Sequence, residues 1–122
     1  MAKENITKPV LQRSIPSPLL ISECSRDGKV IILENTSRNN DISMANWVLR
    51  RRVDNKPEIT FKFPENFTLK TNKTVRIWAG KHGSENLPTD LVNKDIENWL
   101  VAPNSQAFIE NDAGEVKVTY QG

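Results

Sequence analysis

Few residues in the sequence have a type and spacing that could support catalysis. The single histidine, His82, lies in the loop-like segment Gly80–Gly83 and could act as a general base. Such a base needs a nucleophile beside it and a third group to orient it, and no serine or cysteine lies in a nucleophile-elbow pattern. We therefore interpret His82 as an ordinary loop residue and predict that the chain is not an enzyme.

Metal and cofactor sites have no better support. The one cysteine, Cys24, excludes an intramolecular disulfide, and one cysteine with one histidine cannot form a structural zinc site. The sequence contains no glycine-rich phosphate-binding motif and no calcium-binding loop. Because Cys24 lies among strand-forming residues, we expect a buried, unreactive thiol, and we predict no metal and no cofactor.

The remaining chemistry is that of binding. Arg50, Arg51 and Arg52 form a basic run that could contact phosphate, with Arg50 and Arg52 on one strand face and Arg51 on the other. The same run fits a solvated strand face, or an edge whose charge prevents pairing with a foreign strand. We favour this second interpretation, because 17 basic and 15 acidic residues leave a net charge of only +2 and little steering field.

Three tryptophans could form a recognition surface. Trp47 and Trp99 have apolar neighbours and are expected in the core, whereas Trp78 shares a strand face with Arg76. Tryptophan and arginine carry much of the binding energy at protein interfaces, so Trp78 is the best candidate for a contact anchor.

The elements that position these side chains are mostly strands. A chain of 122 residues is long enough for one domain with its own core, and 37% hydrophobic with 26% charged residues is a globular composition. Residues 1–18 are polar, contain three prolines and show no apolar periodicity, so we interpret them as a disordered linker or tail. Residues 19–122 contain seven to nine short strands separated by turns, which predicts an all-β sandwich or barrel of antiparallel strands.

The clearest strand has Ile59, Phe61 and Phe63 alternating with polar residues, so that one face is buried and the other wet. Positive-φ turns are expected at Asp27-Gly28 and at Asn111–Gly114. The alternating apolar residues and the tryptophans define the predicted core, which comprises Trp47, Ile59, Phe61, Phe63, Ile77, Trp99 and Val118.

One segment, residues 88–100, has apolar residues at helical spacing. A helix could begin at Pro88-Thr89, and periodicity alone gives helix and strand equal weight there. The longest apolar run, residues 30–33, is far too short to span a membrane, and no signal peptide or prenylation box is present. We therefore expect an intracellular chain that does not insert into a membrane.

Several segments, in order across residues 20–120, resemble the lamin tail domain, the module that follows the rod in nuclear lamins and lamin-like intermediate filament proteins. The segments that carry the resemblance are Asp27–Lys29, Leu33–Ser37, Ser43–Trp47 (SMANW, similar to SMGNW), Phe61–Pro64, Phe67–Lys70, Val75–Ala79 (VRIWA, similar to VTIWA), Pro88–Val92 (PTDLV), Asn98-Trp99 and Asn111–Val116.

The resemblance implies an immunoglobulin-like β-sandwich without a disulfide over residues 19–122, and strand and loop rather than helix at 88–100. It also implies a non-enzymatic docking surface for proteins of the lamina or cytoskeleton, at the nuclear envelope or in a cytoplasmic filament network. The parent would dimerise through a coiled-coil rod that is absent here. The candidate contact residues are Arg50, Arg52, Lys62, Lys70, Arg76 and Trp78.

Two alternatives remain open. One is a module that binds chromatin or DNA weakly through a basic strand face, which the family's behaviour in nuclear lamins suggests. Glu65 and Asn66 stand where lamins often carry proline and a basic residue, and this departure weakens that alternative. The other is an accessory domain of a rodless protein or of an attached or secreted enzyme.

Overall fold

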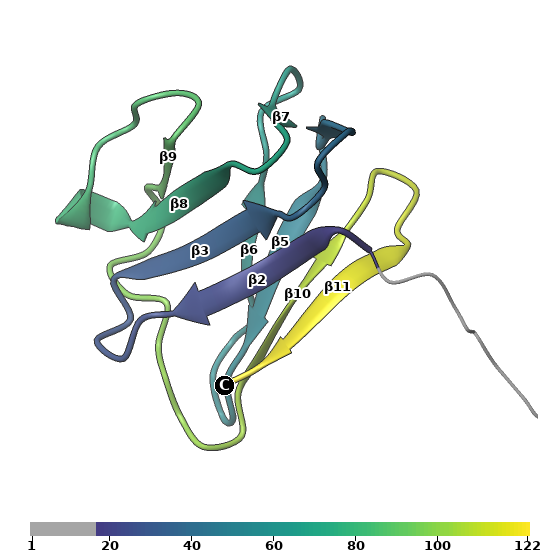
Figure 1. Ribbon diagram of the computed structural model, residues 1–122. Helices are drawn as coiled ribbons and strands as arrows, with labels where there is room; N and C mark the ends of the chain where they lie inside the picture. Colours follow the sequence, from purple (N-terminus) through teal and green to yellow (C-terminus); the bar gives the residue numbers. More distant parts are fainter. Residues whose placement is uncertain (1–16) are drawn as a thin grey trace, which may run out of the picture.

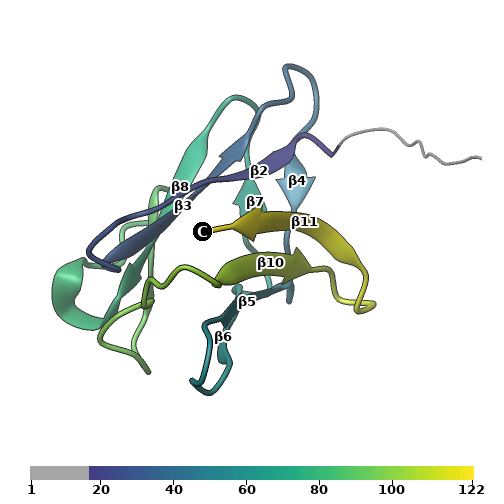
Figure 2. The same ribbon diagram turned by 90° about the horizontal axis from the view of Figure 1, so that it is seen from below.

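The computed structural model describes residues 17–122, which form two facing four-stranded sheets (Figures 1 and 2). The linker or tail predicted for residues 1–18 lies outside the described residues, apart from its last two. The first sheet has the order β2-β3-β8-β9, with β2 at Leu19–Cys24, β3 at Val30–Asn35, β8 at Thr74–Ala79 and β9 at Asp90–Asn93.

The second sheet has the order β11-β10-β5-β6. Its strands are β5 at Val48–Arg52, β6 at Ile59–Lys62, β10 at Gln106–Glu110 and β11 at Val116–Gln121. The short strands β4 (Ile42–Ser43) and β7 (Thr68–Leu69) pair with each other, and a single 3₁₀ turn, η1, covers Gly80–His82. The all-β sandwich predicted from the sequence is therefore confirmed.

Both predicted hairpin turns are present, and each has a glycine with positive φ. Gly28 (φ +72°) lies between β2 and β3, and its amide donates to the Ser25 carbonyl. Gly114 (φ +82°) lies between β10 and β11, where its amide donates to the Asn111 carbonyl. A left-handed backbone at these positions is accessible to glycine without the steric cost that a Cβ imposes.

The core lies between the two sheets, where inward-pointing residues alternate with outward-pointing ones. Of the predicted core residues, Phe63, Ile77 and Trp99 are fully buried. The other four are partly buried and pack against the edge of the core; they are Trp47, Ile59, Phe61 and Val118. Trp47 itself precedes β5 rather than lying in a strand, although its carbonyl accepts a hydrogen bond from the Phe63 amide.

The structure corrects the sequence analysis at β9. All strand pairs in the two large sheets are antiparallel except β8 with β9, which run parallel with Arg76 opposite Asp90 and Trp78 opposite Val92. The connection from Gly80 to Thr89 returns along the sheet before β9 begins, and such a return is what a parallel pair requires. Residues 88–100 therefore form a strand and a loop. They do not form a helix, although their apolar residues have helical spacing.

The loop after β9 is fixed to the body of the domain by several hydrogen bonds. The Trp99 amide donates to the Gly28 carbonyl at 2.7 Å, and Asn98 Nδ2 donates to the Asp27 carbonyl at 2.7 Å. The indole Nε1 of Trp99, which is fully buried, donates to the Ile77 carbonyl at 2.9 Å. These bonds hold residues 95–100 against the β2–β3 turn and against β8.

Candidate protein-interaction surfaces

The six residues predicted as partner contacts do not form one surface. Arg50, Arg52 and Lys62 lie on the outer face of the second sheet. Residues opposite each other on paired strands point to the same side of the sheet, and Lys62 is opposite Val48, which points to the same side of β5 as Arg50 and Arg52. Arg76 and Trp78 lie on the outer face of the first sheet, on the opposite side of the molecule. Lys70 follows β7 and is exposed, and its Nζ lies 3.4 Å from Oδ2 of Asp41.

The outer face of the second sheet, which we call the arginine face, is an ion-pair network. Arg50 donates to Glu110 Oε1 and Glu58 Oε1, both at 2.9 Å, and Arg52 donates to Glu58 Oε2 at 2.6 Å. The Arg52 guanidinium carbon also lies 4.7 Å from the ring centroid of Phe108, which is the distance of a cation–π contact.

These ion pairs stabilise the charged forms of the side chains on the arginine face. The hydrogen bonds to Glu110 and Glu58 raise the pKa of Arg50, and the bond from Arg52 lowers the pKa of Glu58 against the opposing effect of its partial burial. A phosphate that approaches Arg50 or Arg52 must compete with carboxylates already in place. Arg50 and Arg52 are therefore poorly available to the phosphates of a nucleic acid.

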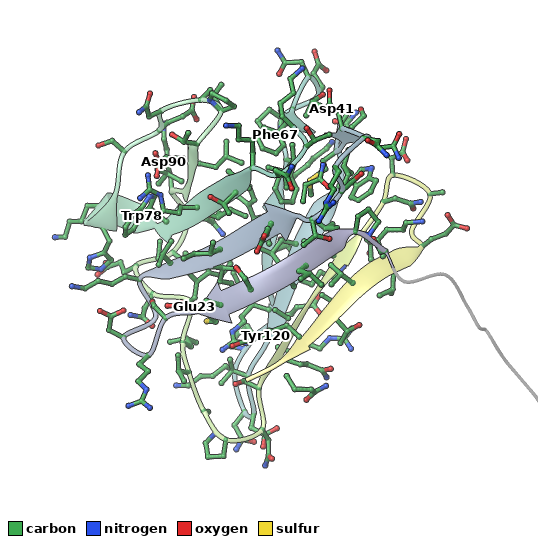
Figure 3. All side chains as sticks on the ribbon, viewed as in Figure 1. Glu23, Asp41, Phe67, Trp78, Asp90 and Tyr120 are labelled. Carbon is green, nitrogen blue, oxygen red and sulfur yellow. The ribbon has the colours of Figure 1, made fainter. Side chains whose placement is uncertain are left out.

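The outer face of the first sheet, which we call the Trp78 face, is built around Asp90. Arg76 approaches this carboxylate with two nitrogens, Nε at 2.9 Å from Oδ1 and Nη2 at 3.2 Å from Oδ2. Trp78 Nε1 donates to Asp90 Oδ1 at 2.8 Å, and the Thr89 hydroxyl donates to Asp90 Oδ2 at 2.8 Å. Figure 3 shows Trp78 and Asp90 on the neighbouring strands β8 and β9.

The Trp78 ring is held on its other side by the loop after β8. A Cβ built on Gly83 would clash with Cγ of Trp78, so the glycine backbone lies directly against the indole. On the neighbouring strands, the apolar side chains of Val30 and Val92 lie opposite the half-buried indole, and Ile32 lies opposite Arg76 on the same sheet face. The face therefore combines a fixed aromatic ring, an exposed arginine and apolar neighbours.

Acid should weaken this arrangement. Burial raises the pKa of Asp90, but the hydrogen bonds from Trp78, Thr89 and Arg76 outweigh it, so its folded-state pKa lies below its ordinary value of about 3.9. A lowered folded-state pKa stabilises the fold above the unfolded-state pKa, and this stability is lost as pH falls through the folded-state pKa. We expect urea unfolding to show a steeper loss of stability below about pH 4 in the wild type than in Asp90→Asn.

The control for that experiment is Asp112→Asn in the exposed β10–β11 turn, which removes one carboxylate without touching the Trp78 face. This variant should keep the wild-type acid profile. An Asp90→Asn profile that runs parallel to the wild type below pH ~4 would show that Asp90 contributes nothing to the pH dependence.

Sequence reasoning missed the role of Arg51. It assigned Arg51 to the face opposite Arg50 and Arg52, and that face is the interior, where Arg51 has no exposed surface. Its guanidinium donates to the carbonyls of Leu100 (2.8 Å), Gly122 (2.9 Å) and Trp99 (3.3 Å) and lies 3.3 Å from Ser105 Oγ. The burial of Arg51 could have been predicted, because it lies two residues after the apolar Leu49 and so points to the same face of β5. Its carbonyl partners could not, because they come from segments that are distant in the sequence.

Within residues 17–122, no group of three or more histidine, cysteine, aspartate or glutamate side chains is placed to hold a metal ion. No helix in the same part of the chain is long and apolar enough to cross a membrane. Burial raises the pKa of the Cys24 thiol, which keeps it in its less reactive, protonated form at neutral pH.

Comparison with known proteins gives consistent results. The family model described as the Lamin Tail Domain matches residues 12–121. The chain is 37% identical over 117 residues to the muscle cell intermediate filament protein OV71 of Onchocerca volvulus, and 34% identical over 117 residues to the muscle cell intermediate filament protein AV71 of Acanthocheilonema viteae. It is 35% identical to intermediate filament protein ifa-3 of Caenorhabditis elegans.

Each of these matches covers 96% of the chain, but only 27%, 30% and 20% of the respective relative. The chain therefore spans between a fifth and a third of the length of the relatives that it matches.

Proposed function

This chain belongs to the lamin tail domain family, which is structural and not enzymatic, and from that premise we propose that it docks partner proteins onto an intermediate filament through its Trp78 face. The parent would be an intermediate filament protein that assembles through a coiled-coil rod. The names of the muscle cell relatives, both intermediate filament proteins, support a place inside the cell as part of a filament network.

The observation that carries the proposal is the fixed, half-exposed indole of Trp78 beside an exposed arginine. Trp78 is held by Asp90 on one side and by Gly83 on the other, so little side-chain freedom is lost when a partner covers it. Arg76 lies 6.0 Å from the Trp78 ring centroid, and tryptophan and arginine are the residue types most enriched at binding hot spots.

DNA is the weaker candidate ligand. Both arginines of the predicted basic strand, Arg50 and Arg52, are engaged with Glu58 and Glu110, and the net charge is only +2. Phosphate binding there would have to break these pairs and would bring little release of counterions.

Site-specific photo-crosslinking in the source cells tests the docking proposal. A photoreactive residue is placed at Thr74, which is exposed on the Trp78 face, or at Thr119, which is exposed on the second sheet. We expect a discrete protein crosslink from Thr74 and not from Thr119. Arg76→Gln removes the cation but can still donate to the buried Asp90, so we expect it to reduce the Thr74 crosslink strongly without changing the thermal midpoint by more than about 8 °C.

The parent band on the same blot tests the assignment to a filament protein. A rod-bearing parent should be much heavier than 13.9 kDa and should resist extraction by high salt and detergent. A soluble parent would favour a rodless protein or an attached enzyme. Crosslinks from Thr119 alone, or a Thr74 crosslink of undiminished yield in Arg76→Gln, would contradict the Trp78 face.

A further inference from the structure

A hollow of about 540 Å³ lies between the start of β6 and the loop after β9, away from the Trp78 face. Its apolar lining includes Ile59, Ile96 and Leu100, all of which are partly buried. Ile59 belongs to β6, an edge strand that pairs only with β5, and the other two come from residues 95–100.

The charged residues that line this hollow are all acidic. They are Glu58, Asp95 and Glu97, and no lysine or arginine lines it. Glu58 is shared with Arg50 and Arg52 of the arginine face, whereas Asp95 and Glu97 are exposed and form no ion pair with any residue in the range 17–122. The hollow therefore presents two uncompensated negative charges beside an apolar floor.

The wall of the hollow is held rigidly. The Asp95 amide donates to Asn93 Oδ1 at 3.2 Å, and the Leu100 amide donates to Asn98 Oδ1 at 2.7 Å. The Leu100 carbonyl accepts from the buried Arg51 at 2.8 Å. A binding wall that is already ordered loses little conformational entropy when a ligand arrives.

Leu100 also has an unusual backbone. Its φ is +69°, a left-handed conformation that costs a side chain such as leucine on the order of 1–3 kcal/mol. Residues held in such conformations cluster at ligand clamps and switch regions. With this backbone conformation, the partly buried Leu100 lines the hollow together with Ile96.

We propose that this hollow binds a short segment of a partner protein in which aliphatic residues are flanked by lysine or arginine. The aliphatic side chains cover Ile59, Ile96 and Leu100, and the flanking cations pair with Asp95 and Glu97. This surface is separate from the Trp78 face and does not depend on it.

Two synthetic pentapeptides with blocked ends test the proposal, Lys-Val-Leu-Val-Arg and its charge-reversed match Glu-Val-Leu-Val-Glu. Titration of each into the isotope-labelled 122-residue chain, followed by amide chemical shifts, gives both affinity and location. We expect the basic peptide to bind at least about tenfold more tightly and to shift residues 57–60 and 95–100. The double variant Asp95→Asn/Glu97→Gln should weaken it by about five- to tenfold, as two exposed pairs would.

The matched control removes the same charge elsewhere. Glu85→Gln/Asp112→Asn also neutralises two exposed carboxylates and should leave the affinity unchanged, as should Arg76→Ala on the Trp78 face. Equal binding of the two peptides, no binding of the basic peptide, or unchanged affinity in the Asp95/Glu97 variant would each overturn the proposal. The Thr74 crosslink should persist in that variant, so failure here and failure of the Trp78 face are separable.

Discussion

Replacing Arg51 with alanine is expected to lower the free energy of unfolding by about 3–5 kcal/mol, because it removes a large buried side chain and leaves buried carbonyl acceptors without their donor. The side chain has no exposed surface, and it fills the space between β5 and the segment that leads into β10. Its loss leaves a cavity and removes the donor that the carbonyls of Trp99, Leu100 and Gly122 now share. Urea unfolding, followed by tryptophan fluorescence, measures the change.

The neighbouring Arg52 supplies the control for this prediction. It is the same residue type one position along β5, but its side chain is 57% exposed and its ion-pair partner is Glu58. Arg52→Ala should cost about 1 kcal/mol or less, because exposed ion pairs contribute little. If Arg51→Ala and Arg52→Ala destabilise the domain equally, the buried guanidinium does not hold these segments together.

Replacing Trp99 with alanine should destabilise the domain by a similar amount, about 3–5 kcal/mol, because a large and fully buried aromatic ring is lost. Trp99 lies in a loop, yet it connects both sheets. Its indole nitrogen donates to Ile77 of the first sheet, and its carbonyl accepts from Arg51 of the second. Its amide also donates to Gly28 in the β2–β3 turn.

Two variants separate the ring volume of Trp99 from its hydrogen bond. Trp99→Phe keeps most of the apolar volume but removes the indole donor, so we expect a loss of about 1–3 kcal/mol. Trp78→Phe is the control, since Trp78 is only half-buried and its acceptor, Asp90, keeps hydrogen bonds from Thr89 and Arg76 when the indole is removed. A Trp99→Ala protein with the same urea midpoint as Trp78→Phe would contradict the bridging role of Trp99.

Local patterns predicted most of the strands and turns. Alternation at Ile59–Phe63 and at Thr74–Ala79 identified strands with one buried face, and the glycine-containing turns identified two hairpins. These features are predictable because they depend on neighbours within a few residues. The parallel β9 was not predictable in this way, since its direction depends on how the chain returns from β8.

The candidate surface was less predictable than the fold. Residue type correctly marked Trp78 and Arg76 as neighbours on one strand face, but it also grouped them with Arg50 and Arg52. Sequence alone does not say which strands share a sheet, so it cannot separate two outer faces. Nor does it show that Glu58 and Glu110 pair with both arginines on one of those faces, because these partners lie 8 and 60 positions from Arg50.

The positions at which the chain enters and leaves the sandwich determine how the domain bears mechanical load. The described chain enters at the start of β2, and Gly122 lies beyond the far end of β11, so these two points are at opposite ends of the strands (Figure 1). A force that separates them runs along β2, whose hydrogen bonds to β3 lie across that direction. The hydrogen bonds between β2 and β3 are thus loaded in shear, so they bear the force together and do not break one after another. At the other end, the hydrogen bond from Arg51 to the Gly122 carbonyl opposes the detachment of β11 from the sheet. We therefore expect the fold to resist a force applied between the start of β2 and Gly122.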